Sequence, residues 1–263
     1  MKIVVAYKWA PNPQDATVGA DGTVDWGRAK AAISEYDPVA VELGRRLADA
    51  TGAELVGVSV GGADVASPMA RKSALSRGFD RIVVVADDSL VGLGTTGTAL
   101  LLAEVVRHIG DVDLVLTGDS SVDVGAQMVP AVLAGALGWP AVAAVGAVTG
   151  TAGDLTVERA HEGGSQVLSL RGPAVLATAS DAVVPRVPGM KDILAAGKRP
   201  TEELALAGLT GFTGLTGSAA RPEVLATHRP ALKARKGQVI EAGTDVAAAV
   251  AELVAALRAD AVI

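Results

Sequence analysis

The chain has 263 residues, of which 23 are basic and 29 are acidic, so its formal net charge is −6. It contains no cysteine, which excludes disulfides, thiolate nucleophiles and cysteine-ligated iron–sulfur or zinc sites, and which favours a cytoplasmic location. Aromatic residues make up only 3% and no basic stripe is visible, so partners should be small molecules or proteins rather than nucleic acid. No uncharged apolar run approaches the roughly 20 residues of a membrane span, so no membrane insertion is expected.

Short runs rich in β-branched residues alternate with helical stretches in the first half of the chain. The runs comprise residues 2–7, 54–60, 81–85 and 113–117. The helical stretches comprise residues 38–51, 64–77 and 98–109, and the last two are followed by Gly78 and Gly110, as helices commonly are. This alternation predicts a parallel sheet with right-handed crossovers, that is, a Rossmann-like α/β fold.

The second half of the chain has a different pattern of predicted elements. Four strands without intervening helices are expected at residues 141–148, 155–161, 165–170 and 174–178, and the glycines between them are typical of antiparallel hairpins at a sheet edge. From Asp181 onward, proline and glycine are too frequent for a packed core element, so we expect an arm or an exposed loop system. A last helix is expected at residues 244–259, capped by Thr244, with an apolar face that needs something to pack on.

The stretch from Gly118 to Pro130 leaves a buried strand, crosses a small polar loop and enters a helix. Ligands of open α/β sheets bind at the carboxyl ends of strands. Gly118 and Gly125 permit close backbone approach, and the free amides from Gly125 to Gln127 would open a helix whose positive end suits a phosphate. An ordinary polar turn is the alternative interpretation, because this is neither a Walker A loop nor a GxGxxG fingerprint. The lack of a P-loop lysine favours a nucleotide held as a fixed component over phosphoryl transfer.

No catalytic constellation is visible in the sequence. Asp123 is a candidate general base, but a lone carboxylate in a polar loop is more often a cap or a ribose ligand, and we favour the ligand role. His108, His161 and His228 show no metal-ligand spacing, and there is no HExxH or GxSxG motif. We therefore expect a protein with neither catalytic residues of its own nor a bound metal ion.

Residues 157–177 form a charged hairpin around a Gly163-Gly164 turn, which would ordinarily be read as a solvated surface hairpin. Its spacing, however, resembles the signature of the electron transfer flavoprotein (ETF) β subunit family. That signature has an apolar residue, a base two places on, an acid-and-glycine turn, a Gln or Glu, and then Pro followed by aliphatic residues. The matching residues are Val157, Arg159, Glu162, Gly163, Gly164, Gln166, Val167, Pro173, Val175 and Leu176. Further matches lie at residues 5–8, 37–42, 118–130, 185–186 and 190–198.

The resemblance implies a β subunit that pairs with an α subunit in a heterodimer and has a fold of the adenine nucleotide α-hydrolase type. In this family the α subunit makes most of the contacts to a redox-active FAD. The heterodimer carries electrons from flavin-dependent dehydrogenases, such as acyl-CoA dehydrogenases, to a quinone-linked oxidoreductase. The β subunit usually buries a structural AMP. By position, the AMP would contact Ala6, Asp37, Pro38, Val39, Ala40, Val60, Gly118, Asp119, Ser120, Ser121, Val122, Asp123, Val124, Gly125, Ala126, Gln127, Met128 and Val129.

The same resemblance implies a division of the chain into a nucleotide-binding domain at 1–184, a recognition loop at 185–200 and a C-terminal arm with a helix at 201–263 that packs on the α subunit. In the recognition loop an exposed apolar residue docks on the dehydrogenase, and Met190 occupies that place. An ordinary core methionine is the alternative interpretation. The other residues expected to take part in docking are Arg186, Pro188, Gly189 and Ile193.

Some features depart from the family pattern. Many relatives have acidic residues beside the hairpin arginine, where this chain has Ala160-His161, so the resemblance implies no charge contact at this position. Some family members hold a second FAD in the β pocket and bifurcate electrons, which is the first alternative. A stand-alone nucleotide-binding sensor is the second, and an adenylyl-transfer enzyme is disfavoured because residues 9–13 offer no pyrophosphate-binding glycine motif.

Overall fold

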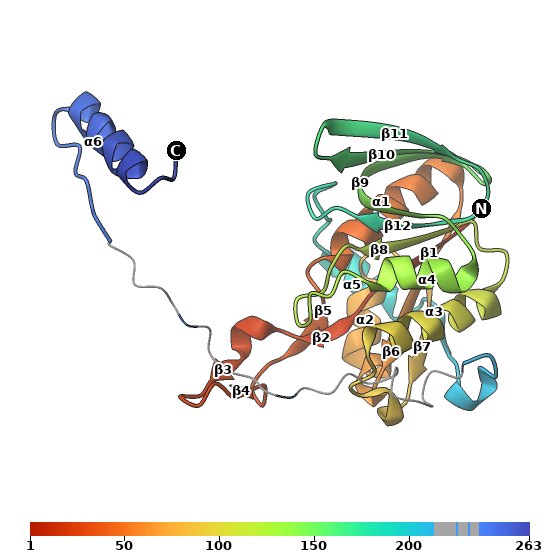
Figure 1. The fold of residues 1–263 in the computed structure, drawn as a ribbon. Coiled ribbons are helices and arrows are strands. Elements are labelled where there is room, and N and C mark those ends of the chain that lie inside the picture. Colours follow the sequence, from red (N-terminus) through yellow and green to blue (C-terminus); the bar gives the residue numbers. More distant parts are fainter. Residues whose placement is uncertain (213–224, 226–230, 232–236) are drawn as a thin grey trace. The chain divides into compact units, whose positions relative to one another are not determined.

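The computed structural model describes residues 1–212, 225, 231 and 237–263. Its main feature is a twisted nine-stranded sheet in the order β11-β10-β9-β12-β8-β1-β6-β7-β13, with helices on both faces (Figure 1). The strands of this sheet are β1 (Lys2–Ala6), β6 (Glu54–Gly61), β7 (Arg81–Ala86), β8 (Leu114–Gly118), β9 (Ala141–Thr151), β10 (Asp154–His161), β11 (Gly164–Leu170), β12 (Ala174–Thr178) and β13 (Thr201–Glu203). The α-helices are α1 (Asp37–Thr51), α2 (Pro68–Leu75), α3 (Thr95–Ile109), α4 (Val129–Leu137), α5 (Met190–Ala196) and α6 (Val246–Ala259).

The predicted Rossmann-like α/β fold is confirmed. Strands β1, β6, β7 and β8 pair in parallel and are buried on both faces, which is why they read as continuous apolar runs in the sequence. Helices α1, α2 and α5 pack into the core on one face of the sheet, and α3 and α4 pack into the core on the other. The parallel part of the sheet therefore brings all its strand ends with their following loops to one edge.

Strand β12 differs from the sequence prediction. Only β9, β10 and β11 form the expected antiparallel edge, whereas β12 lies between β8 and β9 and pairs in parallel with both. All five residues of β12 are buried, so its sequence lacks the alternation of a half-exposed hairpin strand and is typical of a central parallel strand.

The helix boundaries also differ in detail. The stretch predicted as one helix at 64–77 is a 3₁₀ turn, η2 (Ala63–Ala66), followed by α2, which Ser67 caps by accepting a hydrogen bond from the amide of Ala70 at 3.2 Å. Pro68 sets the break, because it disfavours helical geometry in the preceding residue and suits the first position of a new helix. Helix α6 is capped by Asp245 rather than Thr244.

Two short hairpins, not predicted from the sequence, lie between β1 and α1. Strands β2 (Trp9–Pro11) and β5 (Ala31–Ile33) pair with each other, and so do β3 (Thr17–Val18) and β4 (Val24–Asp25). The first hairpin brings Trp9 and Pro11 to the carboxyl end of β1. Short 3₁₀ turns also occur at η1 (Pro13–Asp15), η3 (Asp88–Leu90) and η4 (Leu206–Gly208).

The chain forms two compact units, residues 1–226 and 227–263. The first includes β13, which pairs in parallel with β7 at the far edge of the sheet, and the buried Leu209, so this part of the proline- and glycine-rich region is packed. In the second, none of the residues of α6 is buried. None of the helices in the described part of the chain is long and apolar enough to cross a membrane.

Candidate functional site

A cavity of about 510 Å³ lies at the carboxyl ends of β1, β6 and β8. The helices that follow β1 and β7 pack on opposite faces of the sheet, so the cavity lies where the direction of winding reverses, as in other open α/β sheets. Its walls come from the ends of β1 and β6, the loop between β7 and α3, and the loop between β8 and α4. The lining is mainly apolar with a small set of polar groups, which is typical of a small-molecule site.

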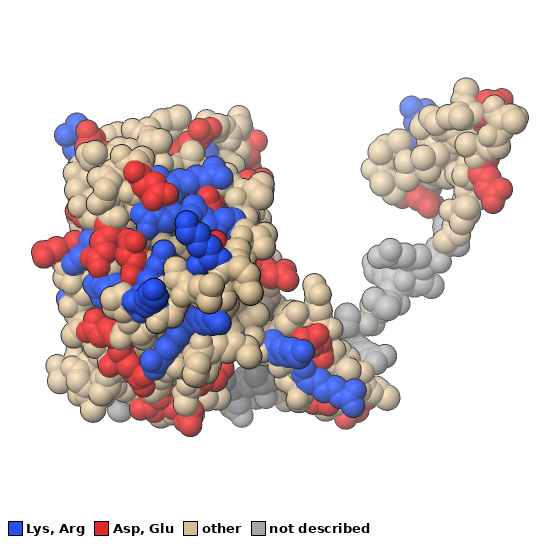
Figure 2. Space-filling model, turned by 180° about the vertical axis from the view of Figure 1, so that it is seen from behind, with Lys and Arg blue, Asp and Glu red and all other residues tan. Residues whose placement is uncertain are grey.

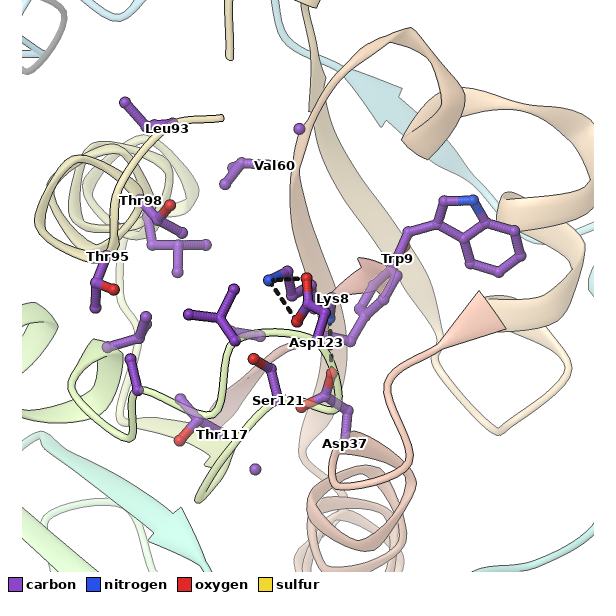
Figure 3. A pocket seen from close by; sticks show the side chains of 18 of the residues that line it. Lys8, Trp9, Asp37, Val60, Leu93, Thr95, Thr98, Thr117, Ser121 and Asp123 are labelled. Atoms are coloured by element: carbon purple, nitrogen blue, oxygen red, sulfur yellow. Dashed lines mark hydrogen bonds and ion pairs between the residues drawn. The ribbon is translucent and has the colours of Figure 1, made fainter. Parts of the chain in front are cut away.

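Three charged side chains lie together at one side of this cavity (Figure 3). Asp37, at the start of α1, accepts a hydrogen bond from the backbone amide of Lys8 at 2.7 Å. The ammonium group of Lys8 forms an ion pair with Asp123 of the β8–α4 loop, with an Nζ to Oδ2 distance of 2.7 Å. Lys8 thereby connects the end of β1 to the β8–α4 loop. Burial raises the pKa of Asp123, but the hydrogen bond and charge of Lys8, together with hydrogen bonds from Ser121 and the backbone, hold it below its usual value.

The carboxyl group of Asp37 is buried, and this burial raises its pKa to about 7. Hydrogen bonds from the backbone amides of Lys8 and Gly118 and the charge of Lys8 act in the opposite direction but do not offset burial. Asp37 is therefore protonated in part of the molecules at neutral pH. Its ionisation must affect stability, because the unfolded chain ionises the same group near pH 3.8.

Asp37→Asn is expected to remove a pH-dependent loss of stability. Between the unfolded and the folded pKa, deprotonation favours the unfolded chain, so the contribution of Asp37 declines as pH rises from about 4 to about 7, by on the order of 4 kcal/mol. The asparagine lacks this decline but loses one acceptor for a backbone amide, which costs about 1 kcal/mol at any pH. The free energy of unfolding, measured in urea at pH 4.5 and pH 8, should be higher for the variant relative to the wild type at pH 8 than at pH 4.5. A stability difference that is the same at both values would contradict this account.

The β8–α4 loop approaches the cavity with an irregular backbone. Gly125 and Gln127 have positive φ values of 65° and 56°, and α4 begins only at Val129, so the expectation that residues 125–127 open the helix is wrong by two residues. The N-terminus of α4 has no side-chain cap, and neither has that of α3, which begins at Thr95. Residues of both first turns line the cavity, and uncapped amides at helix N-termini suit anions such as phosphate.

The cavity brings together most of the residues predicted to surround a nucleotide. These are Ala6, Asp37, Val60, Gly118, Asp119, Ser120, Ser121, Asp123, Val124, Ala126, Gln127, Met128 and Val129. Val122 and Gly125 instead line a neighbouring hollow, and Pro38, Val39 and Ala40 line neither. Val39 and Ala40 are buried in the first turn of α1, which begins at Asp37.

One wall of the cavity was not predicted from the sequence. It is formed by the end of the β7–α3 loop and the start of α3, through Leu90, Val91, Gly92, Leu93, Gly94, Thr95, Thr98 and Leu102. The signal was available, because the glycine- and threonine-rich residues 92–98 directly precede a predicted helix after a predicted strand. Lys8, Trp9 and Thr117 were missed as well; the hydroxyl group of Thr117 is buried and has no hydrogen-bond partner among the described residues.

Residues at the start of α1 approach the backbone of Gly118 closely. A Cβ atom on Gly118 would lie 2.7 Å from Oδ1 of Asp37 and 2.9 Å from the Cβ atom of Tyr36. No group of acidic or histidine side chains in the described part of the chain is arranged to hold a metal ion. His108 contacts Glu202 and His161 accepts a hydrogen bond from the amide of Gly163, while His228 lies outside the described residues.

A comparison with protein families agrees with this geometry. A family model described as the electron transfer flavoprotein domain matches residues 21–209, which is more than half of the chain. The chain belongs to the electron transfer flavoprotein family. ETF proteins are electron carriers associated with flavin, and they work with partner subunits and dehydrogenases. The match includes the end of β6, the β7–α3 loop and the β8–α4 loop of the cavity wall, and the segment that follows β12.

In this ETF chain the segment at 185–200 lies on the surface beside α1 and α2. The side chain of Met190 is 75% exposed, Pro188 and Ile193 are half-buried, and Gly189 precedes α5 as its N-cap. Arg186 faces the body of the protein and forms an ion pair with Glu42. Residues 186–199 carry four basic side chains and one acidic one. Figure 2 shows lysine and arginine side chains gathered on one face of the protein.

Proposed function

We propose that this chain is the β subunit of a heterodimeric ETF. In this proposal it holds a structural AMP in the strand-end cavity and docks flavin-dependent dehydrogenases through residues 185–200. An α subunit would hold most of the FAD, which accepts and passes on electrons when it is bound. The observation that carries the proposal is a nucleotide-sized cavity at the winding reversal of an ETF domain, in a chain that also has a separate segment with an exposed apolar side chain.

The residues around the cavity suit AMP in three ways. The uncapped first turn of α4 and the glycine-containing loop before it offer backbone amides for the phosphate. Asp123 and Ser121 offer oxygen atoms for the ribose hydroxyl groups, and the apolar wall that includes Val60 and Leu93 suits a purine ring.

The exposed side chain of Met190 supports the docking role. An apolar side chain held in solvent contributes nothing to folding, whereas insertion into an apolar pocket of a partner gains its burial energy. A thioether side chain adapts to pockets of different shapes, which suits a carrier that accepts electrons from several dehydrogenases. Lys191 and Lys198 lie near it in the sequence, and their charges would favour a partner whose pocket has an acidic rim.

Met190→Ala in the purified heterodimer is expected to slow reduction by an acyl-CoA dehydrogenase by about tenfold or more, as loss of a binding hot spot does. The content of FAD and AMP should not change. Met69→Ala is the matched control, because Met69 is 71% exposed but lies on α2, outside the docking segment. Equal reduction rates for the wild type and Met190→Ala would contradict the docking role.

A second candidate is an electron-bifurcating relative that holds a second FAD in place of AMP. One observation favours it, namely that the cavity continues from the β8–α4 loop to the uncapped N-terminus of α3, which gives room and a second set of amides for a larger ligand. A stand-alone nucleotide sensor is less well supported, because it would need neither the docking segment nor the C-terminal helix.

A further inference from the structure

The short helix α5 buries few of its side chains against the body of the protein. It has seven residues, of which only Ala196 is buried, while Met190 and Leu194 are exposed. A helix of this length is not stable by itself in water. Asp192 stabilises its first turn locally by accepting a hydrogen bond from the amide of Gly189 at 2.9 Å. That bond shapes the turn but does not fix the helix against the body, so other contacts must do so.

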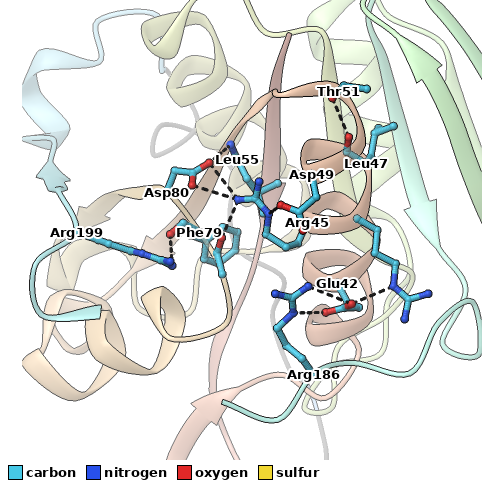
Figure 4. Close-up of polar contacts among 12 residues, drawn as sticks. Glu42, Arg45, Leu47, Asp49, Thr51, Leu55, Phe79, Asp80, Arg186 and Arg199 are labelled. Carbon is cyan, nitrogen blue, oxygen red and sulfur yellow. Dashed lines mark hydrogen bonds and ion pairs between the residues drawn. The ribbon is translucent and has the colours of Figure 1, made fainter. Parts of the chain in front are cut away.

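Two arginines connect the ends of this segment to the body of the protein (Figure 4). Before α5, the guanidinium group of Arg186 donates to both carboxylate oxygens of Glu42 on α1, at 2.6 and 3.3 Å. After α5, Arg199 donates to the carbonyl oxygens of Leu75, the last residue of α2, and of Phe79 in the turn before β7, at 2.8 and 2.6 Å. Both arginines therefore contact the body of the protein.

The contact with Glu42 is suited to a positioning role. The side chain of Glu42 is only 7% exposed, so its charge needs partners, and Arg46 on the same helix supplies one at 3.0 Å. Burial tends to raise the pKa of Glu42, but the hydrogen bonds from Arg186 and Arg46 hold it below its usual value. A bidentate arginine contact fixes direction as well as distance, which a flexible lysine cannot do.

We infer that Arg186 and Arg199 are positioning residues that hold α5 so that Met190 is presented in one orientation to the partner. Arg186, which was expected to touch the partner, instead acts through Glu42. This inference rests on the docking role proposed for Met190. Its physical basis is preorganisation, because a docking side chain on a fixed segment loses less conformational freedom when it binds.

Kinetics of the heterodimer with an acyl-CoA dehydrogenase separate positioning from direct contact. Arg186→Gln and Glu42→Ala should each raise the KM for the heterodimer about fivefold or more, with kcat within about twofold, as expected for lost preorganised binding. The double variant should be no worse than the poorer single variant, because both changes remove one interaction. Arg46→Gln is the control, since it touches the same carboxylate but not the docking segment, and it should behave as the wild type. The inference would be overturned if the effects of the two substitutions on KM multiplied in the double variant. It would also be overturned if Arg46→Gln raised KM as much as Arg186→Gln.

Proteolysis of the same heterodimers tests positioning without any electron transfer. Lysine-specific endoproteinase should cleave after Lys191 and Lys198 about tenfold faster in Arg186→Gln and in Arg199→Gln than in the wild type, because the segment opens locally. Unchanged cleavage in both variants would overturn the inference. Met190→Ala should leave cleavage unchanged, so failure of the docking role shows in kinetics alone and failure of the positioning role shows in proteolysis.

Discussion

A chain that ends at Arg221 is expected to fold and to keep its nucleotide cavity but to lose the α subunit completely. All strands of the nine-stranded sheet and all walls of the cavity lie before residue 213. Residues 227–263 form a separate compact unit, whose helix α6 has no buried residue of its own. The apolar side chains of α6 would be buried only in a complex, and their transfer from water supplies about 1.5 to 3 kcal/mol per side chain.

Co-purification with a tagged α subunit measures this loss. The truncated chain should leave the column in the flow-through, with a thermal transition close to that of the full-length chain. Val250→Gln combined with Leu253→Gln serves as a second variant, because it keeps the full length and changes only exposed positions of α6. If the truncated chain still forms a stable heterodimer, the C-terminal segment is not the arm that we propose.

Gly118→Ala is expected to empty the cavity and to destabilise the fold. The added Cβ atom would meet Oδ1 of Asp37 at 2.7 Å and the backbone carbonyl carbon of Tyr36 at 3.0 Å. Neither neighbour can retreat easily, since Asp37 is buried and hydrogen-bonded and Tyr36 immediately precedes α1. Overpacking of this kind costs about 1 to 3 kcal/mol, and a shifted Asp37 also displaces the amide of Lys8 at the cavity wall.

Gly135→Ala is the matched control for this change. Gly135 lies within α4, and nothing lies within 4 Å of the position of its added Cβ atom. Alanine there should stabilise the protein by roughly 0.5 to 1 kcal/mol, because glycine is unfavourable inside a helix. Nucleotide content after purification should fall at least about tenfold for Gly118→Ala, given a loss of about 1.4 kcal/mol or more, and should not change for Gly135→Ala. Full nucleotide content in Gly118→Ala would contradict the proposed position of the ligand.

The parallel core was predictable from the sequence because its strands are buried on both faces. Such strands read as uninterrupted aliphatic runs, and β1, β6, β7 and β8 lie within one residue of the expected positions. Strand β12 was found, but its neighbours were not, because pairing depends on contacts between residues far apart in the chain. Strand β13 was missed because it is only three residues long and follows Pro200, which interrupts any periodic pattern.

The candidate site was predictable where a motif runs along one stretch of chain and not where distant segments meet. The β8–α4 loop was identified from its own residues, and most of them line the cavity. The ion pair between Lys8 and Asp123 joins residues more than a hundred positions apart, so no local pattern indicates it. The same holds for Arg186, whose partner Glu42 was visible in the sequence only as one more polar residue on the predicted helix.

We propose that this ETF chain binds AMP and pairs with an α subunit that holds the FAD. The most direct test is to co-express the chain with a candidate α subunit, denature the purified complex, and quantify the released AMP and FAD by chromatography. The proposed β subunit predicts one AMP and one FAD per heterodimer. Two FAD and no AMP would indicate a bifurcating relative with a second FAD in place of the structural AMP. The absence of both a complex and flavin would contradict the proposal.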